Sequence, residues 1–546
     1  SSTLMFDHPT ARQVATHLGE SAVVAVDTMT ANASLTSMGT HVEIVGTTVS
    51  LPMGGSAVRE VSYCARDLLC VIPLTRWNVD AAARDLIGSP LEVASRVRHG
   101  GFLRDAELFE HGFFSVSAAE AAAMDPQQRQ LLERGYKALH AAGHSKASLL
   151  GAVVAVNVGQ WASEFVTVLL GTPAGRSVYA STGFACSVTC GRVSFTLGLQ
   201  GPCASYDTAC CASLVANHGS VRALQRSECD AALSAGVNMI LDPAAMRGNA
   251  VGGFTSVRGR SHTFDMRADG YARGEAIDAM ACRLGEQTMP RVLGSAVRQD
   301  GRSASLTAPN GQAQQGVLGA SLADARLMAD EVALLEAHGT GTALGDPIEA
   351  GALSVVLLAH RAANPLVVGS LKANAGHTEP GAGLAGALKL LTQLQGETTS
   401  PNAQLRALNP HVAGALHDVI CALAVQLAVL RGGPRVGGVS SFGYSGTIAH
   451  AVLRHAGGDG RGAALLPPLV NHRHALLWRD PTHPFVQRAS YHMDVAINFR
   501  SPAEGALHAL VADHVVQGRV IFPGAGYLEV ARAAATGSAL RGVFFL

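Results

Sequence analysis

The body of the chain, residues 41–455, alternates between short apolar runs and longer stretches with helical spacing. Short apolar runs bounded by turn residues are typical of buried strands, whereas Glu120–Ala142 is long and has the spacing of a helix. Strands that alternate with helices predict an α/β body with buried strands. The predicted strands are His41–Val49, Ala152–Val158, Cys229–Leu241, Glu331–Ala337, Pro365–Leu371 and Val436–Ser441.

The two ends of the chain differ from this body. Residues 1–20 predict a turn and a short amphipathic helix, and residues 21–40 show no periodicity, which is typical of a linker. A second, glycine-rich linker covers residues 456–470. Residues 471–546 contain a strand-like run at Tyr491–Phe499, and we expect them to be part of an incomplete domain.

The composition is that of a globular protein with a large core. Of the 546 residues, 48% are hydrophobic and 15% are charged, and 41 Lys and Arg balance 41 Asp and Glu. Because the net charge is zero and no basic cluster occurs, we do not expect nucleic acid to be the main partner. The most apolar windows, 149–171 and 351–359, are interrupted by polar residues or too short for a membrane span.

The ten cysteines are scattered without the Cys-x-x-Cys pairs that zinc sites use. This scatter predicts neither a disulfide framework nor a metal centre, so a reducing compartment is the default. The chain begins at Ser1 without an initiator methionine or a targeting segment, and we interpret it as an excerpt. We expect a soluble, intracellular protein of the cytoplasm or a plastid, two locations that the sequence does not distinguish.

The segment Asp207–Val215 holds the first candidate for chemistry. Cys210 stands at the start of a predicted helix, where unpaired backbone N–H groups and the helix dipole favour a thiolate. A cysteine can equally pack as a small core residue. The segment alone leaves both interpretations open.

Two later turns place histidines directly after predicted strands. His338 lies in the run Glu336–Thr342, and His377 lies in the run Lys372–Glu379. A cysteine protease uses one histidine as a base and an Asn or Asp to orient it, so a pair of histidines favours another chemistry. Two imidazole N–H groups that donate to one oxygen would stabilise an enolate.

With these motifs in place, the chain resembles the β-ketoacyl synthases of modular polyketide synthases and fatty acid synthases. Ten landmarks follow in the family's order over roughly residues 41–455. The resemblance implies the thiolase fold, with two duplicated halves in a layered αβαβα body, and a homodimer. The landmarks include DTACCASL at 207–214, FDMRADGYARGEA at 264–276, EAHGTGTALGDPIEA at 336–350, GSLKANAGHTEPGAG at 369–383 and SSFGYSGTIAH at 440–450.

The resemblance also implies which residues form the site. Cys211 would turn about 100° away from Cys210 along a helix and is not expected to be the nucleophile. The implied set is Cys210 as nucleophile, His338 and His377 as the paired histidines, Lys372 as the supporting lysine, Glu349 as its acidic partner, Thr340 and Thr342 as phosphopantetheine-binding hydroxyls, and the backbone N–H groups of Cys210 and Tyr444 as the oxyanion hole.

The reaction implied by the resemblance is a decarboxylative Claisen condensation, catalysed by an acyltransferase of the 3-oxoacyl-carrier-protein synthase type. Cys210 would take an acyl group from a carrier thioester. Loss of CO2 from a malonyl-carrier would leave an enolate, stabilised by His338 and His377, that attacks the acyl group and extends it by two carbons. The ketosynthase itself needs no cofactor, and its substrates are carried on the phosphopantetheine of an acyl carrier protein.

Four positions depart from the family's pattern. Cys211 stands where many relatives have Ser, while Tyr444, Ser445 and Ile448 replace the usual Phe, Gly and Asn of a gating loop. Ser445 adds a Cβ to a loop that can require glycine conformations. These departures leave open the acyl substrate, the product and whether the loop permits elongation.

The ends of the chain resemble two further domains. Residues 1–20 are similar to the tail of an acyl carrier protein, whose modified serine would lie upstream. Residues 513–526 carry an HxxxGxxxxP spacing similar to the first hot-dog half of a polyketide dehydratase, with His514 as its base. Because that family's catalytic Asp belongs to the other half, we expect no dehydration of 3-hydroxyacyl thioesters by this piece.

No acyltransferase motif separates the synthase from the dehydratase. Residues 143–147 lack the last glycine of GHSxG, and no other such motif occurs. This order implies that an acyltransferase acting in trans loads the carrier with malonyl groups.

Two alternatives to elongation remain. A non-elongating ketosynthase only transfers acyl chains, and such relatives often lack the histidine of the HGTGT motif; His338 disfavours this interpretation. A non-catalytic dimerisation scaffold would not need the set of Cys210, His338, His377 and Lys372. A thiolase would use a second cysteine as base, and no such motif is present.

Overall fold

The structure is a computed structural model. It describes residues 41–54, 58–77, 79–80, 90–286, 289–359, 361–362, 364–430, 436–455, 466–478, 485–486, 488–492, 496–501 and 505–534. The predicted carrier tail at 1–20 and the linker at 21–40 lie outside these residues.

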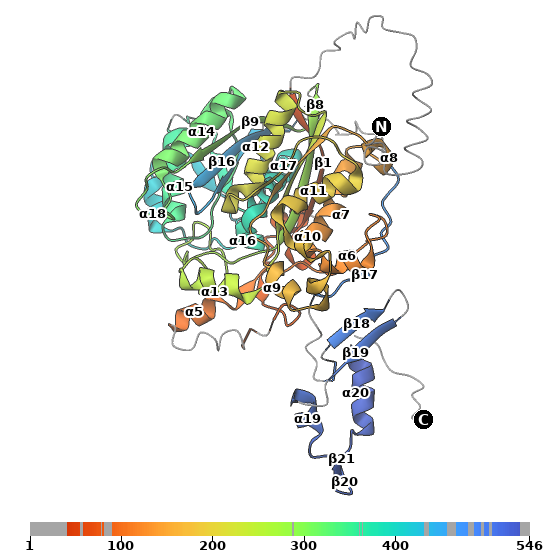
Figure 1. The fold of residues 1–546 in the computed structure, drawn as a ribbon. Coiled ribbons are helices and arrows are strands. Elements are labelled where there is room, and N and C mark those ends of the chain that lie inside the picture. The colour runs from red at the N-terminus through yellow and green to blue at the C-terminus, as the bar shows by residue number, and fades with distance from the viewer. Residues whose placement is uncertain are drawn as a thin grey trace, which may run out of the picture. The chain divides into compact units, whose positions relative to one another are not determined.

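An eleven-stranded mixed sheet runs through the body, and its two halves repeat one pattern (Figure 1). In the first half, parallel strands are followed by the antiparallel strands β8 and β1; in the second, parallel strands are followed by the antiparallel strands β16 and β9. This repetition confirms the predicted duplication. The strand order is β6 (Cys203–Tyr206), β5 (Val154–Gly159), β7 (Ala231–Asn238), β8 (Ala276–Gly285), β1 (His41–Ser50), β9 (Arg291–Gln299), β16 (Thr447–Arg454), β15 (Val436–Phe442), β10 (Leu334–Glu336), β11 (Leu366–Gly369) and β13 (Cys421–Leu423).

Helices form three layers around the two halves of the sheet. The helices α12 (Ala212–Gln225) and α17 (Ala382–Gly396) contact each other and strands of both halves, so they form the middle layer. The outer layers are α7 (Pro126–Ala141) and α11 (Cys186–Leu197) on the first half, and α14 (Gly311–Ala325) with α15 (Gly345–Leu353) on the second. The predicted αβαβα architecture is therefore confirmed.

Shorter elements connect these layers. They are α3 (Val58–Tyr63), β2 (Cys70–Val71), α5 (Leu91–Arg96), β3 (His99–Gly100), β4 (Leu108–Phe109), α6 (Ala118–Ala123), α8 (Lys146–Leu149), α9 (Phe165–Leu170), α10 (Ala180–Phe184), the 3-10 turn η3 (Ala209–Cys211), α13 (Pro243–Val251), α16 (Lys372–Ala375), the 3-10 turn η6 (Glu379–Gly381), β12 (Thr398–Thr399), α18 (Pro410–Ala415) and β14 (Ala428–Val429).

Two predicted elements are wrong in their continuity. The helix predicted over 120–142 is divided into α6 and α7, because a residue before proline avoids the helical conformation and Pro126 therefore begins a new helix. The Asp125 side chain caps α7 by accepting the Gln127 backbone N–H at 2.8 Å. The strand predicted over 491–499 is a hairpin of β18 (Arg488–His492) and β19 (Ala496–Arg500).

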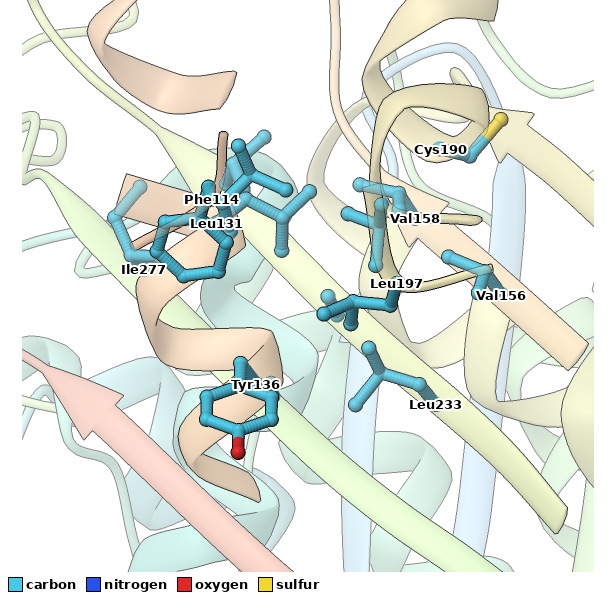
Figure 2. Packing of buried hydrophobic residues seen from close by; sticks show 14 of the residues in the cluster. Phe114, Leu131, Tyr136, Val156, Val158, Cys190, Leu197, Leu233 and Ile277 are labelled. Carbon is cyan, nitrogen blue, oxygen red and sulfur yellow. The ribbon is translucent and has the colours of Figure 1, made fainter. Parts of the chain in front are cut away.

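A hydrophobic cluster joins α7 and α11 to the first half of the sheet (Figure 2). Leu131 of α7 and Leu197 of α11 pack with Val156, Leu233 and other fully buried strand residues. Burying such side chains contributes about 1.5–3 kcal/mol each relative to leaving them exposed. This packing holds α7 firmly on the sheet.

The residues after the second linker pack on the α/β body before the C-terminal segment begins. Strand β17 (His474–Ala475) pairs with β4, and Arg129 donates to the Leu476 carbonyl at 3.0 Å. The Trp478 ring is buried, with the Arg129 guanidinium 5.7 Å from its centre. We therefore place the boundary of the C-terminal segment after Trp478 rather than at 471.

That segment contains β18, β19, α19 (Gly505–Val511), β20 (Val515–Val516), β21 (Arg519–Val520) and α20 (Gly524–Ala534).

Within the described ranges, no helix is both long and apolar enough to cross a membrane.

Asp278 of β8 is a buried carboxyl group whose two oxygens lack hydrogen-bond partners. Burial raises its pKa well above the usual range, and the nearby Gly236 N–H offsets only part of this. The folded-state pKa is thus above that of the unfolded chain. Stability is therefore greatest below the unfolded pKa of about 4 and falls as pH rises through the folded pKa.

We predict that Asp278→Asn stabilises the protein at about pH 8 and flattens the dependence of stability on pH between about pH 5 and 8, because the amide cannot ionise. Thermal unfolding followed by circular dichroism should show a higher midpoint, by roughly 2–4 °C for each kcal/mol. Exposed Asp230→Asn is the matched control and should leave the profile unchanged. An unchanged or lower midpoint for Asp278→Asn at pH 8 would contradict the prediction.

Candidate active site

A strained turn presents Cys210 to a cavity of about 440 Å³. After β6, the chain passes Ala209 at a φ of 54°, in the left-handed region that is rare for alanine, and then enters η3 and α12. Cys210 lines the cavity. The Sγ of Cys211 instead lies 3.1 Å from the carbonyl oxygens of Thr208 and Thr447. This geometry agrees with Cys210, rather than Cys211, as the reactive thiol.

The surroundings of Cys210 favour the thiol over the thiolate. Burial is the largest effect and raises the pKa of Cys210 to about 12; the Glu379 carboxylate acts in the same direction, while the Lys372 ammonium and the Tyr444 backbone N–H oppose it. The sequence-based expectation of a thiolate at a helix start is therefore wrong for the resting site. Desolvation disfavours the charged form more than the backbone dipoles favour it.

His338 and His377 form a pair of neutral imidazoles on the same cavity. Their ring centres are 5.6 Å apart and their planes are inclined by 84°. Burial lowers the pKa of both histidines well below the usual range, and the Lys372 charge lowers it further. Both rings are therefore uncharged at neutral pH.

The hydrogen bonds of the two rings fix where their protons lie. The Phe442 backbone N–H donates to Nδ1 of His338 at 3.2 Å, and the Glu379 backbone N–H donates to Nδ1 of His377 at 3.2 Å. Each Nδ1 is an acceptor, so each Nε2 carries the proton. The Nε2 of His377 is buried without a partner. The pair can donate two N–H groups to one oxygen in the cavity.

Lys372 of α16 is buried close to this pair. Burial lowers the pKa of its ammonium group, while Glu336, Glu349 and Cys210 oppose that shift. Glu349 accepts the backbone N–H groups of His338 at 2.7 Å and Gly339 at 2.8 Å. No ion pair within 4.0 Å joins Lys372 and Glu349. Glu349 therefore acts on Lys372 only through its longer-range charge, and it directly anchors the loop of His338.

Thr340 and Thr342 lie at the cavity as their motif predicts. Their hydroxyl oxygens are 3.2 Å apart, and Thr342 also accepts the Gly345 N–H at 3.1 Å. The loop holds both hydroxyls in place. Their role in binding phosphopantetheine stays a prediction.

The departures in the gating loop disturb its backbone conformation less than the sequence indicates. Ser445 is not among the residues with positive φ; that conformation falls on Gly446, at 92°. L-amino acid side chains rarely adopt this φ, so a substitution at Gly446 would be strained. Ile448 is fully buried against Phe442, behind the cavity. The Tyr444 ring is exposed and lies 6.0 Å from Phe254.

Sequence reasoning missed a buried ion network behind His377. Arg273 donates to Glu379 at 2.8 Å and to Glu164 at 2.7 Å, and Asn238 donates to Glu379 at 2.9 Å. Glu379 in turn supplies the backbone N–H that orients His377. Arg273 and Glu379 both lie inside the family's motifs, which signals importance, but their pairing across 106 positions leaves no pattern in the sequence.

His514 lies apart from this site, in the C-terminal segment. Its side chain is exposed, and its Nδ1 lies 2.6 Å from the Ile521 carbonyl oxygen. Since a carbonyl only accepts, Nδ1 carries the proton and Nε2 is free to act as a base. The dehydratase role of His514 stays a prediction.

No group of three or more His, Cys, Asp or Glu side chains is arranged to hold a metal ion in the part of the chain that the structure describes.

Comparison with known families identifies the class of protein. Residues 40–281 match the N-terminal domain of β-ketoacyl synthase, and residues 289–406 match its C-terminal domain. The chain belongs to the β-ketoacyl synthase family, as a ketosynthase domain of the polyketide synthase type. Residues 483–543 match the polyketide synthase dehydratase domain, so the beginning of such a domain follows the ketosynthase.

Individual relatives agree with this assignment. The chain is 38% identical over 486 residues to the polyketide synthase GfsB of Streptomyces halstedii, covering 86% of this chain and 9% of that protein. It is 38% identical over 471 residues to the spectinabilin polyketide synthase system protein NorC of Streptomyces orinoci, covering 83% of this chain and 20% of that protein. The chain thus spans at most a fifth of the length of these two relatives.

Solved ketosynthase structures share the fold. The ketosynthase from module 6 of the bacillaene synthase of Bacillus subtilis 168 is similar with a TM-score of 0.67 and 30% identity, covering 76% of this chain and 72% of that one. The oxazolomycin ketosynthase domain OzmH KS7 of Streptomyces albus JA3453 gives a TM-score of 0.69 and 30% identity, covering 76% and 75%.

We predict that alkylation of Cys210 by iodoacetamide accelerates about tenfold per pH unit from about pH 7 to 10, because the thiolate reacts and the thiol pKa is about 12. Mass spectrometry of the Cys210 peptide gives the rate. Free N-acetylcysteine in the same tube is the control and should level off above its pKa of about 8.5. A plateau for Cys210 below about pH 9 would contradict a protonated resting thiol.

Proposed function

We propose that this ketosynthase elongates acyl chains by decarboxylative condensation with a malonyl-carrier thioester. The observation that supports this most strongly is the free Nε2–H of His377 beside His338, on the cavity that Cys210 lines. Acyl transfer needs only a thiol and an oxyanion hole, whereas a pair of neutral N–H donors suits a developing enolate.

In the first half-reaction, the sulfur of Cys210 attacks the carbonyl carbon of the acyl-carrier thioester. The tetrahedral oxyanion accepts the backbone N–H groups of Cys210 and Tyr444. Cys210 loses its proton and the departing carrier thiol gains one, so the transfer is neutral overall. Burial raises the pKa of the Cys210 thiol and keeps the resting thiol protonated.

In the second half-reaction, the malonyl-carrier loses CO2 and its thioester carbonyl becomes an enolate. The enolate oxygen accepts the Nε2–H groups of His338 and His377, which are neutral and therefore keep their protons. The enolate carbon attacks the acyl carbon on Cys210. The carbon–sulfur bond breaks, and Cys210 leaves as a thiolate that takes up one proton from solvent. The product is a carrier-bound 3-oxoacyl chain longer by two carbons.

The substrates arrive on the phosphopantetheine of an acyl carrier protein, with Thr340 and Thr342 contacting the arm in the cavity. An acyltransferase acting in trans loads the malonyl group, and the working form is a homodimer. The carrier and homodimer rest on the family, and the loading in trans rests on the absence of an acyltransferase motif. His514 would serve as base once a complete dehydratase domain is assembled.

Intact-protein mass spectrometry tests the nucleophile. We predict that an acyl thioester adds one acyl group to the wild-type chain and to Cys211→Ala, because Cys211 lies outside the cavity lining. Cys210→Ala should remain unmodified. Acylation of Cys210→Ala at the wild-type rate would overturn the assignment.

Addition of a malonyl-carrier tests the histidines. His338→Ala and His377→Ala should still accept the acyl group, but CO2 release and condensation should fall by roughly 10²–10³-fold each, the loss typical of one removed oxyanion donor. Radiolabelled CO2 and the carrier-bound product measure the two steps. A wild-type chain that is acylated but never condenses would instead favour the transfer-only function.

A further inference from the structure

A second cavity of about 350 Å³ lies between α7 and the segment 466–473. We call it the α7 cavity. Its walls include Arg134, Tyr136 and Lys137 of α7, with Phe113 beside them and Arg473 from the segment that precedes the C-terminal domain. None of the active-site residues lines it. The two cavities are therefore separate.

Positive charge is concentrated in the α7 cavity. Arg134 and Lys137 are three residues apart on one helix and so share a face. Burial lowers the pKa of Arg134, and the charge of Arg473 lowers it further. The pKa of Lys137 is likewise lowered by burial, then by Arg134 and Arg473. Three cations thus converge on one space and repel one another.

The carboxylate of the cavity lining does not balance these charges. Glu133 is its one acidic residue, and its side chain pairs with Arg473 at 2.8 Å. One negative charge against three positive charges leaves a surplus of about two. A mobile or bound anion is the natural partner for such a surplus.

Two hydrogen-bond donors of the cavity residues also lack acceptors. The Nε–H groups of Arg134 and Arg473 are buried without partners. An unsatisfied buried donor destabilises the fold, and an accepting oxygen would remove that cost. Guanidinium groups match the oxygens of phosphate in geometry and charge, and they frequently bind phosphate in a bidentate manner, through two parallel hydrogen bonds.

The remaining wall is aromatic and aliphatic. The rings of Phe113 and Tyr136 are 5.2 Å apart, and Leu466 and Leu469 also contribute to the lining. Figure 2 shows the Tyr136 ring at the edge of the hydrophobic cluster, with its hydroxyl pointing away from Phe114 and Leu131. The cavity is larger than a phosphate ion needs and falls in the size range of small-molecule sites, about 300–1,000 Å³.

We propose that the α7 cavity binds a small organic phosphate. The phosphate group contacts Arg134, Lys137 and Arg473. The organic part lies along the rings of Phe113 and Tyr136. A dianionic phosphate matches the surplus of about two positive charges, whereas a monocarboxylate would leave one uncompensated.

Binding would join two parts of the chain. Arg134 and Lys137 belong to a helix fixed on the ketosynthase sheet, while Arg473 belongs to the segment that runs through β17 toward the dehydratase start. A ligand that bridges them stabilises the docked segment by mass action. The occupied cavity thus strengthens the attachment of the segment that leads to the next domain.

Isothermal titration calorimetry on the full chain tests the proposal, with phenyl phosphate as the probe and benzoate and inorganic phosphate as comparisons. We expect phenyl phosphate to bind with one-to-one stoichiometry and at least tenfold more tightly than either comparison. The same binding should persist after alkylation of Cys210, which blocks the catalytic cavity. Loss of binding on alkylation, or equal affinity for benzoate, would overturn the proposal.

Lys137→Glu reverses one charge at a solvent-accessible position and should lower the affinity at least tenfold while ketosynthase activity is retained. Arg226→Glu, a charge reversal at an exposed position outside the cavity lining, is the matched control and should bind as the wild type does. Arg473→Gln is a second variant and should weaken binding without changing acylation of Cys210. Wild-type affinity in Lys137→Glu and Arg473→Gln, or no binding by the wild-type chain, would refute the site.

Discussion

The buried ion pair between Arg273 and Glu379 is the interaction on which the catalytic geometry depends. Arg273 also binds Glu164, whose carboxylate accepts the backbone N–H groups of Leu241 and Asp242 at 2.9 Å. The strand after Arg273 continues into the first half of the sheet, while Glu379 follows His377 and leads into the middle helix α17. Removing one partner would strand a buried charge, at a cost of about 3–5 kcal/mol. The pair therefore fixes the loop of His377 against the sheet that carries Cys210.

The same burial that makes this pair necessary sets the protonation of the reactive groups. Desolvation raises the pKa of the Cys210 thiol and lowers those of His338 and His377, so the resting site holds no charged nucleophile and no charged imidazole. Backbone N–H groups occupy Nδ1 of both rings, which leaves the Nε2 protons for substrate. One physical condition, the exclusion of water, thus selects the donors that an enolate requires and keeps the thiol latent.

The sequence predicted the fold class and the location of the site because ordered motifs mark both. It predicted neither the protonation of Cys210 nor the network of Arg273, since both follow from burial and from contacts between distant residues. The division of the helix at Pro126 could have been predicted from the sequence, because proline disfavours the helical backbone conformation in the residue before it. A Cβ at Gly383 would lie 2.7 Å from that of Leu214, so the glycine allows the two middle helices to approach closely.

The gating loop illustrates how a departure from a family pattern can leave the chemistry intact. The backbone N–H of Tyr444, which we propose as an oxyanion donor, interacts with the Cys210 thiol and is independent of the side chain that replaces the usual phenylalanine. Gly443 packs so closely that a Cβ there would lie 2.6 Å from the Thr208 carbonyl oxygen, and Gly446 carries the positive φ. These two glycines set the path of the loop. Tyr444 and Ser445 lie between them, and the exposed Tyr444 ring lines the catalytic cavity. The side chain at Tyr444 therefore belongs to the lining of the cavity, whereas the position of its backbone N–H is set by the packing and conformation of the two glycines.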